Sequence, residues 1–475
     1  MNYFADIHCH PTMKAYGQSF PSGENSKNPL IASSIWYYDP PNVFEKFIDL
    51  LGGIVKYRQS SFSAAGFGNA GIIFASLYPI ERGFFDNKLG TGEFSDMLLN
   101  FITSVGKNRI DAVQATTDYF PDLEKEYDYL KQLDGKMVRL ADRSLYHYSL
   151  AKNANDVDII LNQDTIQDKK ANSIAVLVTL EGAHAFGTGI NPETNPANRN
   201  YVLGNVGKVK NWTHRPVFVT IAHHFYNELC GHAQSLTGIV QKVVNQSFMM
   251  NTGFTALGKD VVDLMLDNSD NRRILIDIKH MSRSARLEYF KMLETTYKDQ
   301  DIPVIASHAA AIGNENDKNL FLGHDINFYD DEILKIGETN GLFGVQLDER
   351  RIAAPRNHEL KKSHGLERRK VLFHSSALVW RQIQHVAELL DSHGLFAWGI
   401  QCMGSDYDGI INPINGYWTA ENYPTLADYL LMQAHSYMKE NSGNLTQAFN
   451  RIDPEEIVDR VMGDNAYNFL LNYYL

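Results

Sequence analysis

Two histidines two residues apart stand near the beginning of the 475-residue sequence. His8 and His10 close the hydrophobic stretch Tyr3–His10, which predicts a short buried strand. Because alternate residues of a strand project to the same face, both imidazoles are expected to point together. Two neutral imidazoles at a strand end form half of a site for a divalent metal ion. With 17 histidines in the chain, one such pair also arises by chance, so it needs support from other segments.

Side chains that bind metal ions also close five other predicted strands. These strand ends carry Glu181 and His184 (strand Ile174–Gly182), His223 and His224 (Val217–His224), His280 (Arg273–Ser282), His308 (Ile302–Ala310), and Asp406 and Asp408 (Phe396–Gly409). Buried polar residues with purely structural roles would scatter along the strands instead of gathering at one end. The pattern therefore predicts a shared metal site.

The donors of this set outnumber the four ligands of one tetrahedral ion. Glu181, in the middle of the set, can bridge two ions, and two cations that share a water molecule lower its pKa and give hydroxide. Asp406 or Asp408 would accept the remaining proton and return it to the leaving group. His223, outside the metal set, would polarise the substrate carbonyl or stabilise the tetrahedral oxyanion. The sequence thus predicts metal-assisted hydrolysis.

These strand ends need a scaffold that brings them to one side of the molecule. Gly71–Glu81 and Gly341–Asp348 raise the number of predicted strands to eight. Helical patterns lie between the strands, over Val43–Ser60, Asp118–Leu133, Asp156–Asp164, Phe254–Asp267, Ser284–Tyr297, Asp331–Thr339 and Leu366–Ser392. This alternation predicts one α/β domain over residues 1–475, a (β/α)8 TIM barrel.

Four long connections follow predicted strands directly and are expected on the face of the barrel that carries active sites: residues 11–39, 82–150, 187–215 and 353–365. The alternative is that they are tolerated surface insertions. The segment 425–475 predicts a helical C-terminal extension packed on the barrel, with Pro454 opening one helix.

Composition excludes several classes of partner. The net charge is −12, from 44 basic and 56 acidic residues, and no basic stripe stands out, so nucleic acid and anionic membranes are not expected to bind. Three scattered cysteines (Cys9, Cys230 and Cys402) fit a reducing compartment. With no signal-peptide pattern and no membrane-spanning run, we expect a cytoplasmic protein. A homodimer is left open.

At the strand ends the sequence resembles the membrane dipeptidase (renal dipeptidase-type) family of the amidohydrolase superfamily. The similarity runs nearly end to end. Its most specific parts are Val178–His184, Leu257–Asp260 with Leu275–Ser282, Pro303–Ala310, Gly404–Gly409 and Asp453–Ala466.

Motif by motif, the resemblance implies a role for each residue type at the strand ends. His8 and His10 would bind a first Zn²⁺, Glu181 would bridge, and His280 with His308 would bind a second Zn²⁺. Asp406 would contact the first zinc and act as general base, and His223 would contact the tetrahedral centre of the substrate. His184 and His224 are expected to be structural, because His224 should face away from His223, and Cys9 should alternate away from the metal.

The activity implied is hydrolysis of an amide bond in a small substrate, a dipeptide first, through a hydroxide that bridges two metal ions. Two alternatives stay open. One is another amidohydrolase activity, on a lactone, a cyclic amide or an N-acyl amino acid. The other is a barrel that has lost catalysis and binds a ligand.

Two positions depart from the family pattern. The first motif of the family is His-x-Asp, whereas His8-Cys-His10 carries one negative charge less. After the histidine of the sixth strand, the family has an arginine that holds the dipeptide carboxylate, and Ile326 stands there. Arg350 and Arg351, just past the seventh strand, are candidate substitutes as substrate-binding residues, the alternative being that they only face solvent.

Overall fold

Eight parallel strands close into a barrel in the computed structural model, which describes residues 3–52, 55–85, 100, 103–162, 165–166, 169–236, 241–242, 244–313, 319–440 and 442–475. Neighbouring strands pair in the order β1 (Phe4–Cys9), β2 (Ala70–Leu77), β7 (Asn172–Glu181), β8 (Phe218–Thr220), β9 (Leu275–Asp277), β10 (Ile305–Ala309), β11 (Leu342–Val345) and β12 (Gln401–Met403). The last strand meets the first just beyond β12, where Tyr407 forms a parallel bridge with Cys9. The predicted (β/α)8 TIM barrel is confirmed.

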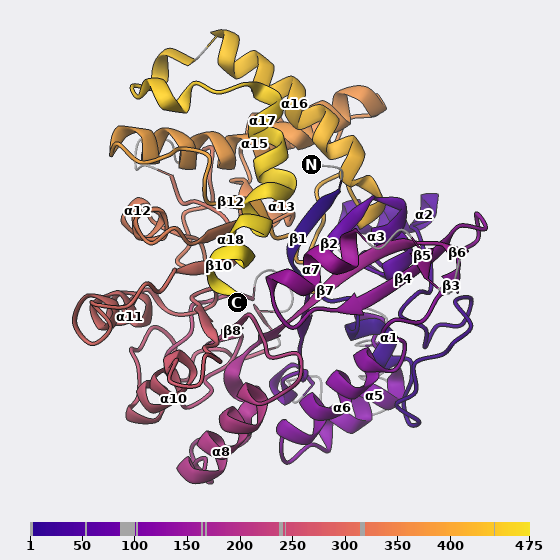
Figure 1. Cartoon of the computed structure of the whole chain (residues 1–475), viewed down its shortest axis with the longest axis vertical. Coiled ribbons are helices and arrows are strands. Elements are labelled where there is room, and N and C mark those ends of the chain that lie inside the picture. The colour runs from indigo at the N-terminus through magenta and orange to yellow at the C-terminus, as the bar shows by residue number, and fades with distance from the viewer. Residues whose placement is uncertain are drawn as a thin grey trace.

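Helices cover the outside of the strands (Figure 1). The helices that follow β7 to β11 are α8 (Arg199–Lys210), α10 (Ala256–Leu266), α11 (Arg283–Thr295), α12 (Asp330–Glu338) and α15 (Arg368–Ser392). Side-chain caps start three of them: Asn198 accepts from the Tyr201 amide before α8, Thr255 from the Gly258 amide before α10, and Ser282 from the Ala285 amide before α11. These caps fix the residue at which each helix begins.

The long connections and the C-terminal segment add further elements. They are α1 (Met13–Gly17), α2 (Val43–Gly52), α3 (Phe62–Phe67), α5 (Lys107–Gln114), α6 (Phe120–Lys131), β3 (Val138–Arg139), β4 (Leu145–Leu150), α7 (Ala154–Leu161), β5 (Thr165–Ile166), β6 (Lys169–Lys170), α13 (Glu349–Ile352), α14 (His358–Ser363), α16 (Tyr423–Glu440), α17 (Pro454–Asp459), a π-helical turn (Arg460–Asp464) and α18 (Asn465–Tyr473). β4 pairs in parallel with the beginning of β7 and antiparallel with β3. Among the described residues, every helix is too short or too polar to cross a lipid bilayer.

Several predicted elements end earlier than expected. The helix predicted over Val43–Ser60 ends at Gly52 in α2, and residues 55–60 are not helical. Their backbone groups have other partners, because Lys14 Nζ donates to the Tyr57 carbonyl (2.6 Å) and the Ser60 amide donates to Asp408 (2.8 Å). Of the predicted helical segments, residues 53–54 and 163–164 lie outside the described part, as do 86–99 and 101–102 of the long connection.

Two buried aspartates tie the strand ends together from inside the barrel. Asp277 accepts from Thr220 Oγ1 of β8 (2.5 Å) and from Ser307 Oγ of β10 (2.6 Å). Asp6 of β1 accepts from the Ser405 amide (3.0 Å) and from the hydroxyl of Tyr423 in α16. Burial raises the pKa of both carboxyl groups, which these hydrogen bonds oppose. These hydrogen bonds thus connect the neighbouring strand ends that carry the predicted ligands.

Glu126 of α6 braces the loops above β1 and β2. Its carboxylate accepts from Thr12 Oγ1 (2.6 Å) and from the Tyr78 amide (2.9 Å), and the residue is 1% exposed. Burial raises its pKa from 4.5 to about 7.

This raised pKa gives a testable pH dependence of stability. The folded state holds the Glu126 proton more tightly than the unfolded state, so the protein loses stability as the pH rises from 4.5 through 7. The loss is about 3 kcal/mol over that window, at 1.36 kcal/mol per pKa unit. A Glu126→Gln variant lacks this term. Urea unfolding at pH 5 and pH 8 should show its stability improving relative to the unsubstituted protein as the pH rises, whereas parallel pH curves would contradict the assignment.

Candidate metal centre

The six side chains predicted as metal ligands converge at the mouth of the barrel. Three overlapping groups, each with ligand atoms within 4.8 Å of one another, contain all of them: His8, His10 and Glu181; His8, His308 and Asp406; and Glu181, His280 and His308. All six are buried. They come from β1, β7, β10 and the segments after β1, β9 and β12, so the barrel brings together residues up to about 400 positions apart in the sequence.

Glu181 stands at the centre of this arrangement. Its Oε1 lies 3.5 Å from His8 Nε2 and 3.4 Å from both His280 Nε2 and His308 Nε2. Its Oε2 lies 3.1 Å from His10 Nε2. Asp406 Oδ1 lies 3.6 Å from His10 Nε2 and 3.9 Å from His8 Nε2. One carboxylate thus faces histidines on two sides, as a ligand shared by two ions would.

The donor atoms of this cluster fit cations. Both ring nitrogens of His8 and Nε2 of His10 are buried without a hydrogen-bond partner among the described residues, and a cation bound here would supply a partner for the Nε2 atoms. Each ring is held from behind where a partner exists: His10 Nδ1 donates to the Ser76 carbonyl (3.1 Å), and His308 Nδ1 lies 2.9 Å from Ser307 Oγ. Such partners turn the Nε2 atoms toward the cluster.

Electrostatics keep these groups in the forms that metals bind. Burial works against the charge of Glu181, but His223, His8 and His10 hold its pKa well below the usual value, so it is a carboxylate. Burial and the charge of His223 lower the pKa of His280 to about 3, so its ring is neutral. His10 shows the opposite: burial lowers its pKa, but Glu181 and Asp406 raise it to about 10. A cation between these carboxylates and His10 would replace that proton.

Backbone strain marks two of the ligand positions. His280 and Asp406 have φ angles of 63° and 61°, in the left-handed region that non-glycine residues rarely occupy. Both lie beyond the observed ends of their strands, since β9 stops at Asp277 and β12 at Met403. The strands predicted to run through these residues were therefore too long at their carboxyl ends.

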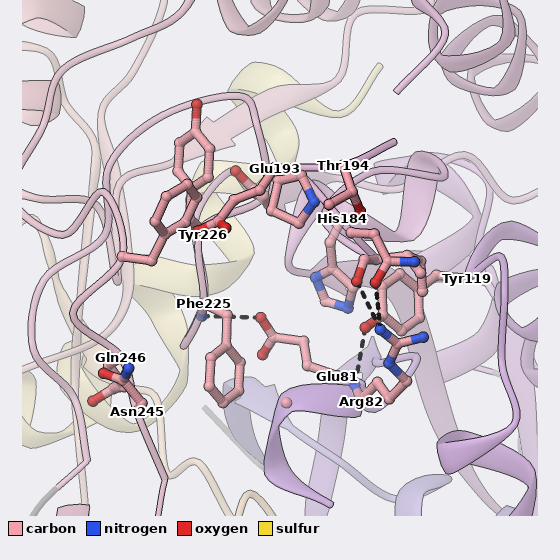
Figure 2. A pocket seen from close by; sticks show the side chains of 17 residues that line it. Glu81, Arg82, Tyr119, His184, Glu193, Thr194, Phe225, Tyr226, Asn245 and Gln246 are labelled. Atoms are coloured by element: carbon pink, nitrogen blue, oxygen red, sulfur yellow. Dashed lines mark hydrogen bonds between the residues drawn. The ribbon is translucent and has the colours of Figure 1, made fainter. Parts of the chain in front are cut away.

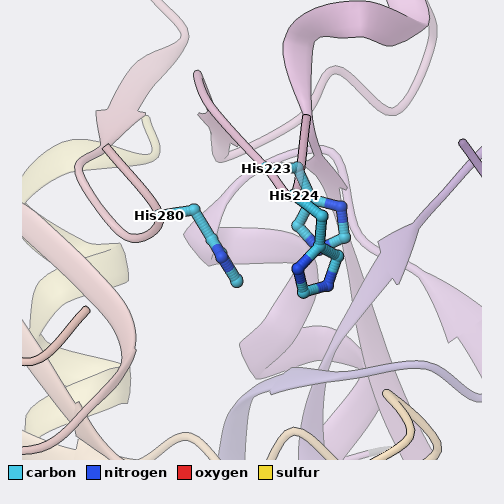
Figure 3. Close-up of side chains that lie close together, drawn as sticks. All are labelled: His223, His224 and His280. Carbon is cyan, nitrogen blue, oxygen red and sulfur yellow. The ribbon is translucent and has the colours of Figure 1, made fainter. Parts of the chain in front are cut away.

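The early end of β8 overturns one expectation. His224 does not face away from His223: their ring centroids lie 3.9 Å apart, and the His224 ring lies 5.1 Å from that of His280 (Figure 3). Alternation of side chains applies to strands, and β8 ends at Thr220. His224 Nδ1 lies 2.5 Å from Ser235 Oγ, and the three rings together form a further group with ligand spacing.

The two aspartates after β12, Asp406 and Asp408, have different surroundings. Asp408 lies away from the cluster, where it accepts from Ser60 Oγ (2.8 Å) and pairs with Lys14 Nζ at 3.1 Å. Both Asp406 and Asp408 have positive φ angles, so they do not share a strand face as residues i and i+2. Of the two carboxylates left open as the general base, only Asp406 reaches the metal cluster. Cys9 does alternate away, toward the Phe74 carbonyl.

Glu81 holds His223 from behind. His223 Nδ1 donates to Glu81 Oε2 (2.6 Å), and its Nε2 lies 3.5 Å from Glu181 Oε1. Burial opposes the charge on Glu81, but His223 and His184 hold its pKa at about 2. His184 is engaged elsewhere, since its Nε2 donates to the Pro79 carbonyl (2.7 Å).

The two candidate arginines differ sharply. Arg350 is committed to Asp348, to which Nε and Nη2 both donate (2.9 and 2.8 Å). Arg351 is 8% exposed, and Nη2 donates to the Ser235 carbonyl, while Nη1 is buried without a partner among the described residues. Its charge interacts with Asp348 and, more weakly, with Asp406, as that of Arg350 also does. Arg351 differs from Arg350 in having a buried donor atom without a partner among the described residues and no hydrogen bond to a carboxylate.

A second buried cation lies near Arg351. Lys279 Nζ has one long contact, to the carbonyl of Ile326 (3.4 Å). Burial and the charge of Arg351 lower its pKa to about 7. Ile326 is the residue at the position where the resemblance placed an arginine, and its side chain is buried. A lysine thus approaches this position from the neighbouring β9 loop.

A pocket of about 480 Å³ opens next to Glu81, the carboxylate that holds His223 (Figure 2). Glu81, Tyr119, His184 and Phe225 are among its lining residues, together with residues of the long connection after β7, such as Glu193. Figure 2 shows Glu81 at the wall of this pocket, bonded to the Phe225 amide. The connection after β7, predicted on the active-site face, lines a cavity there.

A family model described as "Membrane dipeptidase (Peptidase family M19)" matches residues 113–453 of the chain. The chain belongs to this family. It is accordingly a metal-dependent hydrolase of the dipeptidase type. No curated protein matches the sequence significantly.

Solved structures show the same fold. The metallopeptidase "dipeptidase AC" of family M19 is 14% identical, with 91% of this chain and 94% of that chain covered and a TM-score of 0.50. A metallopeptidase from Rhodobacter sphaeroides, liganded with a phosphinate mimic of the dipeptide L-Ala-D-Ala, is 13% identical, with 99% of both chains covered and a TM-score of 0.52. The family match begins after β1 and β2, so His8, His10 and Glu81 lie outside it.

Sequence reasoning missed three residues of this membrane dipeptidase family site. Glu81 closes the predicted strand Gly71–Glu81, and the rule that singled out the other strand ends applies to it equally. Lys279 stands directly before His280, where a charged side chain in a buried segment is a signal in itself. Gln346 follows β11, and its Nε2 donates to Asp406 Oδ2 (2.8 Å). No sequence motif predicts this contact.

Proposed function

We propose that this family member hydrolyses an amide bond in a small substrate, with a dipeptide as the first candidate, at a centre of two divalent metal ions. The observation that carries the proposal is the position of Glu181 between His10 on one side and His280 with His308 on the other. His8, His10 and Asp406 would hold one ion, His280 and His308 the other, and Glu181 both. When bound, the ions lower the pKa of water and polarise the substrate carbonyl.

The protein's own groups would divide the remaining work. Asp406 would accept a proton and return it to the leaving amine; Gln346 donates to its Oδ2, and Oδ1 lies toward His8 and His10, so the carboxylate is held at the cluster. His223 presents Nε2 to the centre, where it would donate to the oxygen of the tetrahedral intermediate.

Arg351 and Lys279 would supply the anchor for a substrate carboxylate. Two buried cations without an anionic hydrogen-bond partner are costly, because each loses its hydration. A carboxylate placed between them would compensate both charges. Since Arg350 is paired with Asp348, the anchor role falls to Arg351.

The two adjacent arginines provide a matched test of the anchor. Replacing Arg351 by Met should raise KM for a dipeptide about 10- to 100-fold, as expected for the loss of a charged hydrogen bond, and kcat should change less. Arg350→Met removes the same charge one residue away and should leave KM within about threefold. Steady-state kinetics would contradict the assignment if the effects of the two variants were equal or reversed.

The proposed function is tested by elemental analysis of metal per chain, followed by a dipeptide-library hydrolysis assay on the same sample. Two ions with dipeptide cleavage would support it. Two ions without cleavage would direct the search to lactones, cyclic amides and N-acyl amino acids. A chain that takes up no metal even after reloading would refute the proposal. Zinc as the metal, a cytoplasmic location and a homodimer stay predictions from the sequence.

A further inference from the structure

We propose that Glu81 is a positioning residue that acts through His223, holding its ring so that Nε2 meets the reacting centre. The inference rests on the proposed function in placing His223 at that centre. It adds a residue from the segment after β2 that lies outside the matched family segment and outside the set of predicted ligands.

The Glu81 carboxylate accepts four hydrogen bonds from groups around it. Oε2 accepts from His223 Nδ1 (2.6 Å), Tyr78 Oη (3.1 Å) and the His224 amide (3.4 Å). Oε1 accepts from the Phe225 amide (3.1 Å). Glu81 and His223 are each 3% exposed. All four donors belong to residues beside the metal cluster, and three of them are groups of His223, His224 and Phe225, so we assign the role of Glu81 to holding this loop.

The hydrogen bond between Glu81 and His223 fixes the orientation of the His223 ring, which the barrel strands do not determine. β8 ends at Thr220, so His223 stands on a loop whose backbone alone does not orient the ring. With Nδ1 bound to Glu81, the opposite atom Nε2 points to Glu181 Oε1 at 3.5 Å. The buried Glu81 carboxylate thus engages Nδ1, and Nε2 is the ring nitrogen left to face the reacting centre. The same carboxylate also fixes the loop amides of His224 and Phe225.

A double-mutant cycle tests whether Glu81 acts through His223. Glu81→Gln keeps the size of the side chain but removes its charge. We expect kcat to fall about 10- to 100-fold, with KM and bound metal unchanged. In a His223→Asn background, Glu81→Gln should lower kcat less than threefold further, since the group it positions is gone. Multiplying effects would overturn the proposal, because Glu81 would then act independently of His223.

Two further readouts separate positioning from general damage. The metal-loaded Glu81→Gln variant should bind a phosphinate mimic of L-Ala-D-Ala about 10- to 100-fold more weakly by calorimetry. The low-field proton resonance of a histidine N–H bound to a carboxylate should vanish in both Glu81→Gln and His223→Asn. Loss of this signal in His223→Asn alone, or in neither variant, would overturn the proposed pair.

Control variants separate an effect through His223 from other effects of changing Glu81. Tyr78→Phe removes another donor to the same carboxylate but keeps the ring that packs edge-on against His223 (centroids 4.7 Å apart), and it should keep kcat within about threefold. If Glu81→Gln does not fold, Glu81→Asp keeps the charge but withdraws it from His223, and it should lower kcat in the same cycle. If His223→Asn alone leaves kcat within threefold, the oxyanion role in the proposed function fails. A large effect of His223→Asn with none of Glu81→Gln refutes only the further inference.

Discussion

A Glu181→Gln variant is expected to lose both metal ions together and at least about 10³-fold in kcat, because even partners of metal ligands cost about 10- to 100-fold. Glutamine offers one acceptor oxygen and no charge. It cannot satisfy both His10 on one side and His280 with His308 on the other, which now face separate oxygens of one carboxylate. Elemental analysis after dialysis would measure the metal per chain.

Glu126→Gln is the matched control for this experiment, because it changes a buried glutamate of α6 that contacts none of the candidate ligands through its side chain. It should retain the metal content of the unsubstituted protein. Loss of a single ion from Glu181→Gln would show that the carboxylate serves one metal position only, and the two-ion proposal would lose its central residue.

The Asp406→Asn variant is expected to separate metal binding from turnover. Asparagine can still present an oxygen toward His8 and His10, and four histidines and Glu181 remain, so most of the metal should stay bound. It cannot accept the proton that hydrolysis releases, so kcat should fall about 10²- to 10⁴-fold. Metal content and kcat, measured on the same preparation, decide between the two effects.

Asp408→Asn tests the other carboxylate of the same segment. Its partners Lys14 and Ser60 show a bracing role, so the substitution should lower the stability of the fold, with kcat per folded, metal-loaded molecule within about tenfold. Turnover retained by Asp406→Asn but lost by Asp408→Asn would reverse the assignment of the base.

The sequence was a good guide wherever regular strand geometry holds. His8 lies within β1 and His10 directly after it, so the expectation that their rings point together while Cys9 turns away holds in the structure. The barrel followed from eight hydrophobic runs between helical patterns. These features depend on local periodicity, which a single sequence displays directly.

Beyond the strand ends the same reasoning failed, for a physical reason. His224 and Asp408 lie where the chain has left the sheet, and Asp408 adopts a left-handed backbone angle. Side-chain direction there depends on long-range contacts, such as Ser235 with His224 and Lys14 with Asp408. Sequence periodicity also could not predict that Arg350 pairs with Asp348. Nor could it predict that Arg351 keeps a buried donor atom without a partner among the described residues.

The barrel closes where β1 meets the segment after β12, and this has a consequence for the synthesis of the protein. A ribosome releases His8 and His10 about 400 residues before Asp406, whose amide donates to the His8 carbonyl (2.9 Å). Ser405 and Tyr423, which donate hydrogen bonds to Asp6, are likewise synthesised long after it. Because chains are synthesised at about 5–20 residues per second, β1 spends tens of seconds without the segment after β12. Metal capture should therefore be a late event in biosynthesis, and a chain released before Asp406 should carry an open barrel with an incomplete set of ligands.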